Sequence, residues 1–432
     1  MNVLGIRKED KNKWEKRAPI IPKDVGDLVK NHSCQFIVQS SDNRAFSDNE
    51  YEEEGAIIEN TLENADVIFA VKEIPSKLIS QKVYIFFSHV IKGQRYNMPM
   101  LKKILKENAT LIDYEKVVDS KGRRLIFFGN WAGLSGINET LWGYGQRLLK
   151  IEGIQTPFLK LKHTFEYNNV EEQKKYFEDL SKDIEKNGLN LPIFCGFAGY
   201  GNVSKGAQSF LDILPVIEID PNDLKSFFEE GNFSKNHVYK IVFKEEHLVE
   251  PNDPNHKFDL QDYYDNGLDK YHSKFHEYLP YLTILVNALF WSAKYPRLIR
   301  KEGFKSLIKE NSRLKIIGDI SIDIEGAIEG SLESTKPDNP IITYDPFTDS
   351  TYLGLIKGGM PIMAIDNLPC ELPKESSISF SSTLKEYVLP IANADFKGNF
   401  DKLNLPSEIK DAIIVYQGKL TPNYTYLEKY LQ

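Results

Sequence analysis

Short β-rich runs alternate with amphipathic helical stretches in the first part of the chain, and this alternation constrains the fold more than any other feature. The predicted strands span residues 3–6, 35–39, 67–71, 83–87 and 111–113. The predicted helices between them span residues 22–30 and 100–107. Strands that are separated by helices pack as a parallel sheet with helices on its faces. We therefore expect an α/β fold.

A second α/β unit opens near residue 191. A predicted strand at 191–195 is followed by a glycine-rich turn, a helix-like stretch that ends at Leu214 and a short strand at 216–219. Strand-like runs resume at 285–290, 314–319 and 363–366. The glycine-rich residues 129–150, which turn helical around 141–149, mark a candidate crossover between domains. Residues 221–276 are polar and weakly periodic, and they predict a long insertion.

Composition excludes several classes of protein. The 432 residues are enough for two or three domains, and the net charge of −8 argues against nucleic-acid binding. Three widely spaced cysteines indicate neither a disulfide framework nor a zinc cluster. No apolar run reaches the roughly 18 residues that a membrane span requires. We expect a cytoplasmic protein, or one in the mitochondrial matrix if a transit peptide has been removed.

The glycine-rich turn predicts a dinucleotide site. Gly199 and Gly201 match the first two glycines of the dinucleotide-binding pattern, but Ser204 stands at the third position. A predicted strand precedes the turn, a predicted helix follows it, and the acids Glu218 and Asp220 come nineteen and twenty-one residues after Gly199, where such sites carry an acid. The alternative is an ordinary turn between a strand and a helix.

Polar residues also follow the predicted strands of the first part. Lys72 and Glu73 follow one apolar run, His89 ends the next, and Glu115 follows a third. Each alone is more often structural, but at the ends of successive parallel strands Lys72 and His89 form a candidate acid–base pair. A lysine that works near neutral pH needs its pKa lowered by roughly three units, about 4 kcal/mol.

A charged loop follows the first predicted strand, and it contains six basic residues between Arg7 and Arg17. It suits a substrate rich in carboxylates, with a solvated surface turn as the alternative. We expect no metal site. His272 and His276 have helical spacing, but no third ligand is evident and a solvated helix explains them.

Seven motifs together resemble one family. They are GIRKEDKNKWEKRAPIIP, FFSHVIK, LIDYEKVVDSKGRRLIFFGNWAG, GYGNVSKGAQ, YPRL, GDISID and AIDNLP, in order between positions 5 and 369. The chain resembles lysine-ketoglutarate reductase, the lysine-forming saccharopine dehydrogenase, and above all the reductase half of the bifunctional α-aminoadipic semialdehyde synthases. The resemblance implies two Rossmann-like parallel-sheet domains with an interdomain cleft, as in alanine dehydrogenase and transhydrogenase. The implied substrate domain is 1–130 plus 367–432, and the implied dinucleotide domain is 131–366 with the insertion at about 221–276.

The resemblance also implies roles for individual residues. Lys72 matches the general base and His89 the general acid. The matches to substrate-binding or tuning positions are Arg17, Gln94, Glu73 and Glu115. The matches to cofactor positions are Arg123, Arg124, Phe128, Gly199, Gly201, Asn202, Ile365 and Asp366, beside the acid Asp220. Phe290 departs from the pattern, since relatives usually have tyrosine there, and we assign it no role.

The implied reaction is the reductive condensation of L-lysine with 2-oxoglutarate to saccharopine. The implied cofactor is NADP(H), as in the animal and plant relatives, although Asp220 favours NAD(H). The implied partner is a glutamate-forming saccharopine dehydrogenase module, either linked or separate. Two alternatives are another amino-acid dehydrogenase of the alanine dehydrogenase fold and an inactive dinucleotide-binding regulatory module.

Overall fold

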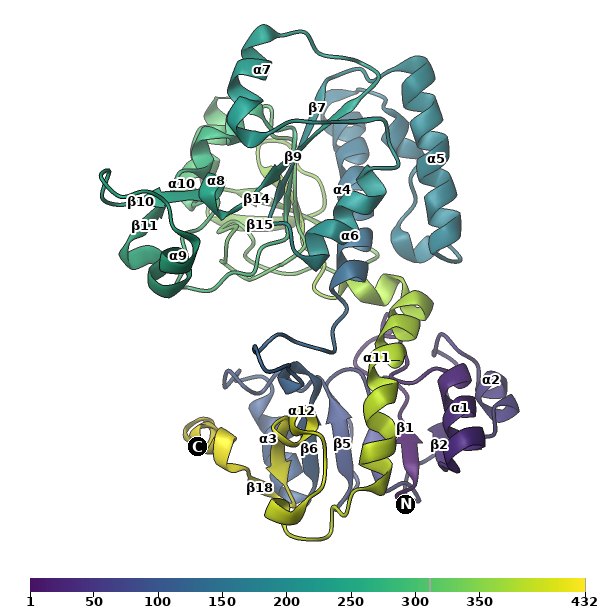
Figure 1. Ribbon diagram of the computed structural model, residues 1–432. Helices are drawn as coiled ribbons and strands as arrows, with labels where there is room; N and C mark the ends of the chain where they lie inside the picture. The colour runs from purple at the N-terminus through teal and green to yellow at the C-terminus, as the bar shows by residue number, and fades with distance from the viewer. Residues whose placement is uncertain (311, 432) are drawn as a thin grey trace. The chain divides into compact units, whose positions relative to one another are not determined.

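The chain folds into two compact α/β units in the computed structural model, which describes residues 1–310 and 312–431. Unit 1 comprises residues 1–128 and the chain from residue 373 onward, and unit 2 comprises residues 129–372. The chain therefore leaves unit 1 once and returns to it once. Figure 1 shows the two units with their elements labelled.

Unit 1 is built around one sheet whose central strands are short and fully buried. Its helices and strands are β1 (Leu4–Ile6), α1 (Pro22–His32), β2 (Phe36–Gln39), α2 (Asp48–Glu53), β3 (Ile57–Glu59), β4 (Val67–Phe69), β5 (Val83–Phe86), α3 (Met98–Lys106), β6 (Thr110–Asp113), α11 (Pro373–Asn393), α12 (Ser407–Lys410), β17 (Ile413–Tyr416) and β18 (Lys419–Leu420). The predicted strands and helices of residues 3–113 are confirmed, with ends that differ by one or two residues.

The sheet of unit 1 has the order β18-β17-β6-β5-β4-β1-β2-β3. Strands β1 to β6 pair in parallel, whereas β17 pairs antiparallel with both β6 and β18. Only two residues separate β17 from β18, and so short a connection permits only a hairpin. The parallel prediction therefore holds for the body of the sheet, and one edge is antiparallel.

Unit 2 contains a second sheet of the same kind. Its helices and strands are α4 (Gly129–Arg147), α5 (Val170–Asn187), β7 (Ile193–Ala198), α6 (Asn202–Leu211), β8 (Val216–Glu218), α7 (Leu224–Glu230), β9 (Val238–Phe243), α8 (Glu245–Leu248), β10 (Val249–Pro251), α9 (Leu260–Asn266), β11 (Tyr271–Ser273), β12 (Ile284–Asn287), α10 (Lys301–Lys309), β13 (Ile316–Asp319), β14 (Ile341–Asp345), β15 (Ser350–Leu353) and β16 (Met360–Met363). The strand order is β15-β14-β16-β13-β12-β7-β9-β8, parallel except for the β14–β15 hairpin and the β14–β16 pair.

Strand β7 shows why both faces of this sheet are covered. Ile193, Cys195 and Phe197 belong to one hydrophobic cluster, while Phe194 and Ala198 belong to another. Successive side chains of a strand point to opposite faces, so an apolar run without polar alternation marks a strand that is buried on both sides. The first cluster includes residues of α4, α5 and α6, and the second includes residues of α7 and α10 (Figure 1).

The structure corrects four sequence predictions. Residues 221–276 are not wholly an insertion, because they contain β9, which pairs in parallel with β7 and β8 inside the sheet. The run predicted as a strand at 363–366 is shifted, since β16 ends at Met363. Helix α4 begins at Gly129, well before the predicted 141–149, and its Gly133 lies where a Cβ would overlap the Val203 carbonyl oxygen, so this glycine belongs to a helix contact rather than to a turn.

The fourth correction concerns His272 and His276, which do not share a helix. His272 lies in β11 and His276 lies in the separate 3₁₀ turn Phe275–Glu277. His272 contacts Asn252 and Glu250 instead. Across residues 1–310 and 312–431, no helix is both long and apolar enough to span a membrane.

Candidate active site

The candidate acid–base residues gather at one edge of the unit 1 sheet. Strands β1, β4, β5 and β6 are parallel neighbours, so their carboxyl ends open at the same edge. Arg7 follows β1, Lys72 and Glu73 follow β4, His89 follows β5, and Glu115 follows β6. The fold thus brings together residues that are far apart in the sequence.

Glu73 is the centre of a charged chain. Its Oε1 lies 2.5 Å from Nδ1 of His89, and its Oε2 accepts a hydrogen bond from Nζ of Lys11 at 2.9 Å. Burial alone would raise the pKa of Glu73, but the hydrogen bond and charge of His89, together with Lys11 and Lys72, hold this pKa well below its usual range. Glu73 is therefore an anion that orients the His89 ring.

Lys72 is the basic group of this edge. Burial lowers the pKa of its ammonium, the nearby positive charge of Arg17 lowers it further, and the Glu73 carboxylate partly opposes both. A lysine with a depressed pKa carries a neutral amine at lower pH than usual. The direction of the shift is the one that a general base requires.

Glu9 holds the main chain at Lys72. Its two carboxylate oxygens accept hydrogen bonds from the backbone N–H groups of Val71 at 2.7 Å and Lys72 at 3.0 Å. Burial and the neighbouring charge of Glu15 raise the pKa of Glu9 to about 7, although both backbone hydrogen bonds and Arg7 oppose the shift. The Glu9 carboxyl group thus fixes the backbone just after β4, which carries the Lys72 side chain.

Arg17 is fully buried in the charged loop. Its Nε donates to Oε1 of Glu15 at 2.7 Å, and its Nη2 lies 2.5 Å from Oε2. The guanidinium also sits over the ring of Phe128, 4.2 Å from the ring centre, and Phe128 stacks on Phe380 at 4.7 Å. Arg17 is therefore held in place by a bidentate carboxylate and an aromatic face.

His89 has a strained backbone. Its φ of 50° lies in the left-handed region, which residues other than glycine rarely adopt. Nδ2 of Asn97 donates to the carbonyl oxygens of Ser88 at 3.0 Å and His89 at 3.3 Å and so stabilises this turn. Strain of this kind persists only where surrounding contacts impose it, and it is frequent at active sites.

The end of β6 carries a second group of acids. Asp113 accepts a hydrogen bond from the Ser88 hydroxyl, and burial raises its pKa to about 6. Glu115 pairs with Arg124. Arg123 is exposed and pairs with Asp119 at 2.7 Å. Gln94 is half-buried, and its Oε1 accepts from the backbone N–H of Lys92 at 3.2 Å.

The glycine loop of unit 2 has the features of a phosphate cradle. Gly199 has a φ of 99°, and a Cβ there would lie 3.1 Å from the Ala288 carbonyl oxygen. Gly201 precedes α6 and has open space where a Cβ would be, and no side chain among the described residues caps the amino end of α6. Uncapped N–H groups and a helix dipole bind phosphate. The residues present fit a dinucleotide.

A cavity of about 380 Å³ adjoins this loop. Asp220 lines it beside Lys205 and Lys244. Glu218 and Glu246 also line it, and all three acids are exposed, but the Glu218 carboxylate pairs with Lys240 at 3.0 Å. Ile365 is buried and Asp366 is exposed, just beyond the end of β16, and Phe290 is 82% exposed.

The predicted site residues thus fall into two groups. The first group, in unit 1, contains Lys72, His89, Glu73, Glu115, Arg17, Gln94, Arg123, Arg124 and Phe128. The second group, in unit 2, contains Gly199, Gly201, Asn202, Asp220, Ile365 and Asp366. Sequence reasoning missed Glu9, Glu15, Asn97 and Asp113. One sequence feature could have pointed to the two glutamates: they are acidic residues inside a basic run that directly follows a predicted strand.

Comparison with known proteins agrees with this architecture. The family model for the N-terminal domain of alanine dehydrogenase/PNT matches residues 5–135, and the C-terminal domain model matches residues 252–423. An L-alanine dehydrogenase structure covers 99% of this chain and 99% of its own, with a TM-score of 0.63 and 14% identity. A transhydrogenase from Sinorhizobium meliloti covers 97% of this chain and 100% of its own, with a TM-score of 0.55 and 16% identity. At these identities, the two structures show the fold alone.

Relatives in sequence cover nearly the whole chain. The mitochondrial α-aminoadipic semialdehyde synthase of Bos taurus is 35% identical over 99% of this chain and 48% of its own length. The Arabidopsis thaliana α-aminoadipic semialdehyde synthase is 34% identical over 99% of this chain and 41% of its own length. This chain therefore spans about half the length of these relatives or less. The saccharopine dehydrogenase [NAD(+), L-lysine-forming] of Candida albicans is 27% identical over 91% of this chain and 93% of its own. The predicted fold and family are confirmed, and the chain belongs to the alanine dehydrogenase/PNT family, with α-aminoadipic semialdehyde synthases and lysine-forming saccharopine dehydrogenases among its relatives.

Proposed function

We propose that this chain is an oxidoreductase that condenses L-lysine with 2-oxoglutarate and reduces the product to saccharopine. The observation that carries the proposal is the arrangement after β4 and β5, where Lys72 with a lowered pKa adjoins the His89–Glu73 pair. The sequence relatives, whose names include lysine-forming saccharopine dehydrogenases, support this choice over other reactions.

The proposed chemistry needs one base and one acid. The ε-amine of the substrate lysine attacks a keto carbon only when it is neutral, and the neutral amine of Lys72 accepts its proton. His89 then donates a proton to the departing keto oxygen, which leaves as water. The resulting carbon–nitrogen double bond is reduced by hydride, which a bound nicotinamide cofactor supplies.

The charge of the site suits these substrates, which carry three carboxylates between them. Lys11 and Arg17 add positive charge beside Lys72, and each well-placed charged hydrogen bond contributes roughly 1.5–3 kcal/mol. Arg17 and Gln94 remain the proposed substrate-binding positions. Because Glu15 already holds Arg17, we propose that Arg17 also acts through its field on Lys72.

For the cofactor we propose NADP(H), with NAD(H) as the alternative. Lys205 and Lys244 line the same cavity as Asp220, and cations favour a ribose that carries a phosphate. Lys244→Met is expected to raise the KM for NADPH at least several-fold more than the KM for NADH. An equal change in the KM values for NADPH and NADH would favour NAD(H).

The assay that tests the function follows NADPH and NADH oxidation with lysine alone, 2-oxoglutarate alone, and both together. The proposal requires oxidation only when both substrates are present. Oxidation with pyruvate and ammonia instead would indicate an alanine dehydrogenase, and cofactor binding without turnover would indicate a regulatory module.

Two variants test the residues. Lys72→Met and His89→Gln are each expected to lower kcat by about 10²–10⁴-fold, the range typical of a lost general acid or base. The Kd of the cofactor, measured by fluorescence titration, should stay within a factor of two or so of wild type. Wild-type turnover in both variants would overturn the assignment.

We also propose that the saccharopine formed here passes to a glutamate-forming dehydrogenase module, linked or separate. The length of the animal and plant relatives supports a linked arrangement. For the compartment we propose the cytoplasm, or the mitochondrial matrix as in the name of the bovine relative. Immunofluorescence of the natural protein would decide between these compartments.

A further inference from the structure

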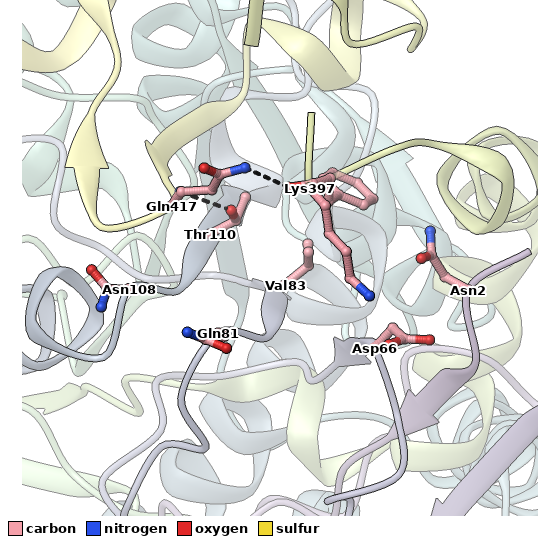
Figure 2. Close-up of a pocket in the computed structure, with 9 residues that line it drawn as sticks. Asn2, Asp66, Gln81, Val83, Asn108, Thr110, Lys397 and Gln417 are labelled. Atoms are coloured by element: carbon pink, nitrogen blue, oxygen red, sulfur yellow. Dashed lines mark hydrogen bonds between the residues drawn. The ribbon is translucent and has the colours of Figure 1, made fainter. Parts of the chain in front are cut away.

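A polar cavity lies at the edge of the unit 1 sheet opposite the candidate active site. It has a volume of about 410 Å³ (Figure 2). Asn2, Asp66, Gln81 and Asn108 line it, each just before the start of a strand: β1, β4, β5 and β6, respectively. Thr110, and Lys397 and Gln417 from the C-terminal part of the chain, add further polar groups to the lining. Because these strands are parallel, the cavity opens at their amino ends, whereas Lys72 and His89 follow their carboxyl ends.

Two opposite charges face this cavity without neutralising each other. In Figure 2 the Lys397 ammonium extends toward the side of the cavity formed by Asp66 and Asn2. Oδ2 of Asp66 accepts a hydrogen bond from the backbone N–H of Val3 at 2.9 Å. Among the described residues, no donor reaches Oδ1 of Asp66 and no acceptor reaches Nζ of Lys397.

The amides of the cavity are partly fixed in position. Nδ2 of Asn2 donates to the Ala394 carbonyl oxygen at 2.8 Å, and Nε2 of Gln417 donates to the Phe396 carbonyl oxygen at 2.8 Å. The side-chain amides of Gln81 and Asn108, in contrast, make no hydrogen bond to other described residues. The cavity therefore offers pre-positioned groups together with donors and acceptors that a ligand can use.

Backbone strain is concentrated at the same place. Gln81, Asn108 and Gln417 have φ values of 62°, 50° and 47°. They are three of the eight non-glycine residues with positive φ in the described chain, and all three line this one cavity. Such conformations cost of order 1–3 kcal/mol each and cluster at ligand sites.

We propose that this cavity binds a free α-amino acid as a zwitterion. Lys397 takes the carboxylate, Asp66 takes the ammonium, and the amides of Gln81 and Asn108 bond a polar side chain. A phosphate ligand fits less well, because Lys397 is the one cation among the described residues that line the cavity, and the Asp66 carboxylate would repel an anion. The inference does not depend on the proposed reaction, since every residue of the cavity lies away from the candidate acid–base pair.

Isothermal titration of each of the twenty L-amino acids into the full chain tests the proposal. At least one is expected to bind, and its affinity should fall at least about tenfold in Lys397→Met and in Asp66→Asn, as for a lost charged hydrogen bond. Lys402→Met and Asp401→Asn are matched controls, because both side chains are exposed in the same unit outside the cavity, and they should bind as wild type does. Circular dichroism melts establish that the variants are folded.

The corresponding amine without the carboxylate, and the acid without the amino group, separate zwitterion binding from simple ion binding. Both should bind at least about tenfold more weakly than the amino acid. The proposal is overturned if no amino acid binds, if the deaminated acid binds equally well, or if Lys397→Met and Asp66→Asn both keep wild-type affinity. In the last case the amino acid occupies another site, such as the proposed active site, and the reductase assay decides that question separately.

Discussion

Lys72 lies between charges of both signs, and this balance sets the pH at which its amine becomes neutral. Glu73 raises the pKa of Lys72 and Lys11 lowers it, whereas burial, the largest cause, lowers it independently of either residue. Glu73→Gln is therefore expected to shift the rising limb of the kcat/KM–pH profile to lower pH, and Lys11→Met to shift it to higher pH.

The two variants control for each other, because their pH profiles are expected to shift in opposite directions. A structural defect would lower activity in both variants without moving the two profiles in opposite directions. Profiles that move the same way, or that do not move, would show that Lys72 is not the group whose ionisation limits activity. The measurement is kcat/KM for 2-oxoglutarate between pH 5 and about 10.

Glu9 is a buried carboxyl group that links folding stability to pH. Its pKa is raised to about 7, with burial as the main cause, and the charges that face it are those of Glu15 and Arg7. The folded chain thus binds this proton more tightly than the unfolded chain, so the contribution of Glu9 to stability falls as pH rises from about 4.5 to about 7.

Glu9→Gln is expected to remove this pH dependence, which is worth a few kcal/mol at most. The variant loses one of the two backbone hydrogen bonds at Val71 and Lys72, so it should be less stable than wild type at pH 5 and closer to it at pH 8. Urea denaturation at pH 5 and pH 8 measures the free energy of unfolding of the variant and of the wild type. An equal loss of stability at the two pH values would contradict the raised pKa of Glu9.

The positions of the candidate acid–base groups could be predicted from the sequence, but their partners could not. Lys72, His89 and Glu115 follow apolar runs, and parallel strands bring their carboxyl ends together. That Glu73 rather than Glu115 contacts His89 depends on the paths of the chain after β4 and β5. That Glu15 holds Arg17 depends on the path of the loop after β1. Loop paths depend on tertiary contacts that no local pattern specifies.

Helices α4 and α6 pack through glycines at their contact. A Cβ on Gly133 of α4 would overlap the carbonyl oxygen of Val203, and a Cβ on Gly206 of α6 would overlap the carbonyl oxygen of Asn130. Because the obstacle is backbone rather than a flexible side chain, it cannot move aside cheaply. The glycine-rich composition of residues 129–150 is thus a requirement of packing, although it obscured the start of the helix in the sequence.

Gly133→Ala is expected to destabilise unit 2 by about 1–3 kcal/mol or more through overpacking. Gly303→Ala in α10 is the matched control, since its nearest obstacle is the Ile299 side chain at 3.5 Å, and alanine there should stabilise the helix by up to about 1 kcal/mol. Thermal melts of both variants measure the difference. A Gly133→Ala variant as stable as wild type would show that the two helices separate readily.

At the level of elements, burial on both faces decided which strands could be predicted. The runs at β5 and β7 carry no charged residue and stand out in the sequence. Strand β9 was missed because it contains Lys240, whose ammonium is nearly buried and pairs with Asp212 and Glu218. A single charged residue inside a strand thus hid an inner strand of the sheet within a polar segment.

At the level of the whole molecule, each unit has a hydrophobic core of its own. One cluster of buried side chains lies wholly in unit 1, and two others, one on each face of the second sheet, lie wholly in unit 2. Unit 1 is assembled from two separate stretches of chain, because α11, β17 and β18 belong to it, whereas unit 2 is one continuous stretch. The return of the chain to unit 1 was implied by the family resemblance and not by local sequence patterns.

A fragment of residues 129–372 is therefore expected to fold by itself and to bind the dinucleotide. It keeps both hydrophobic clusters of unit 2, the glycine loop and the cavity that contains Asp220. The expected observations are a cooperative thermal melt by circular dichroism and an increase of the melting temperature with added NADPH or NADH.

Gly199→Ala in the same fragment should abolish that increase, because a Cβ at a φ of 99° strains the loop beside the Ala288 carbonyl oxygen. A fragment that is unfolded, or that melts at the same temperature with and without both dinucleotides, would contradict the expectation that unit 2 folds by itself and binds the cofactor. Retained cofactor stabilisation in Gly199→Ala would instead exclude the glycine loop as the phosphate site.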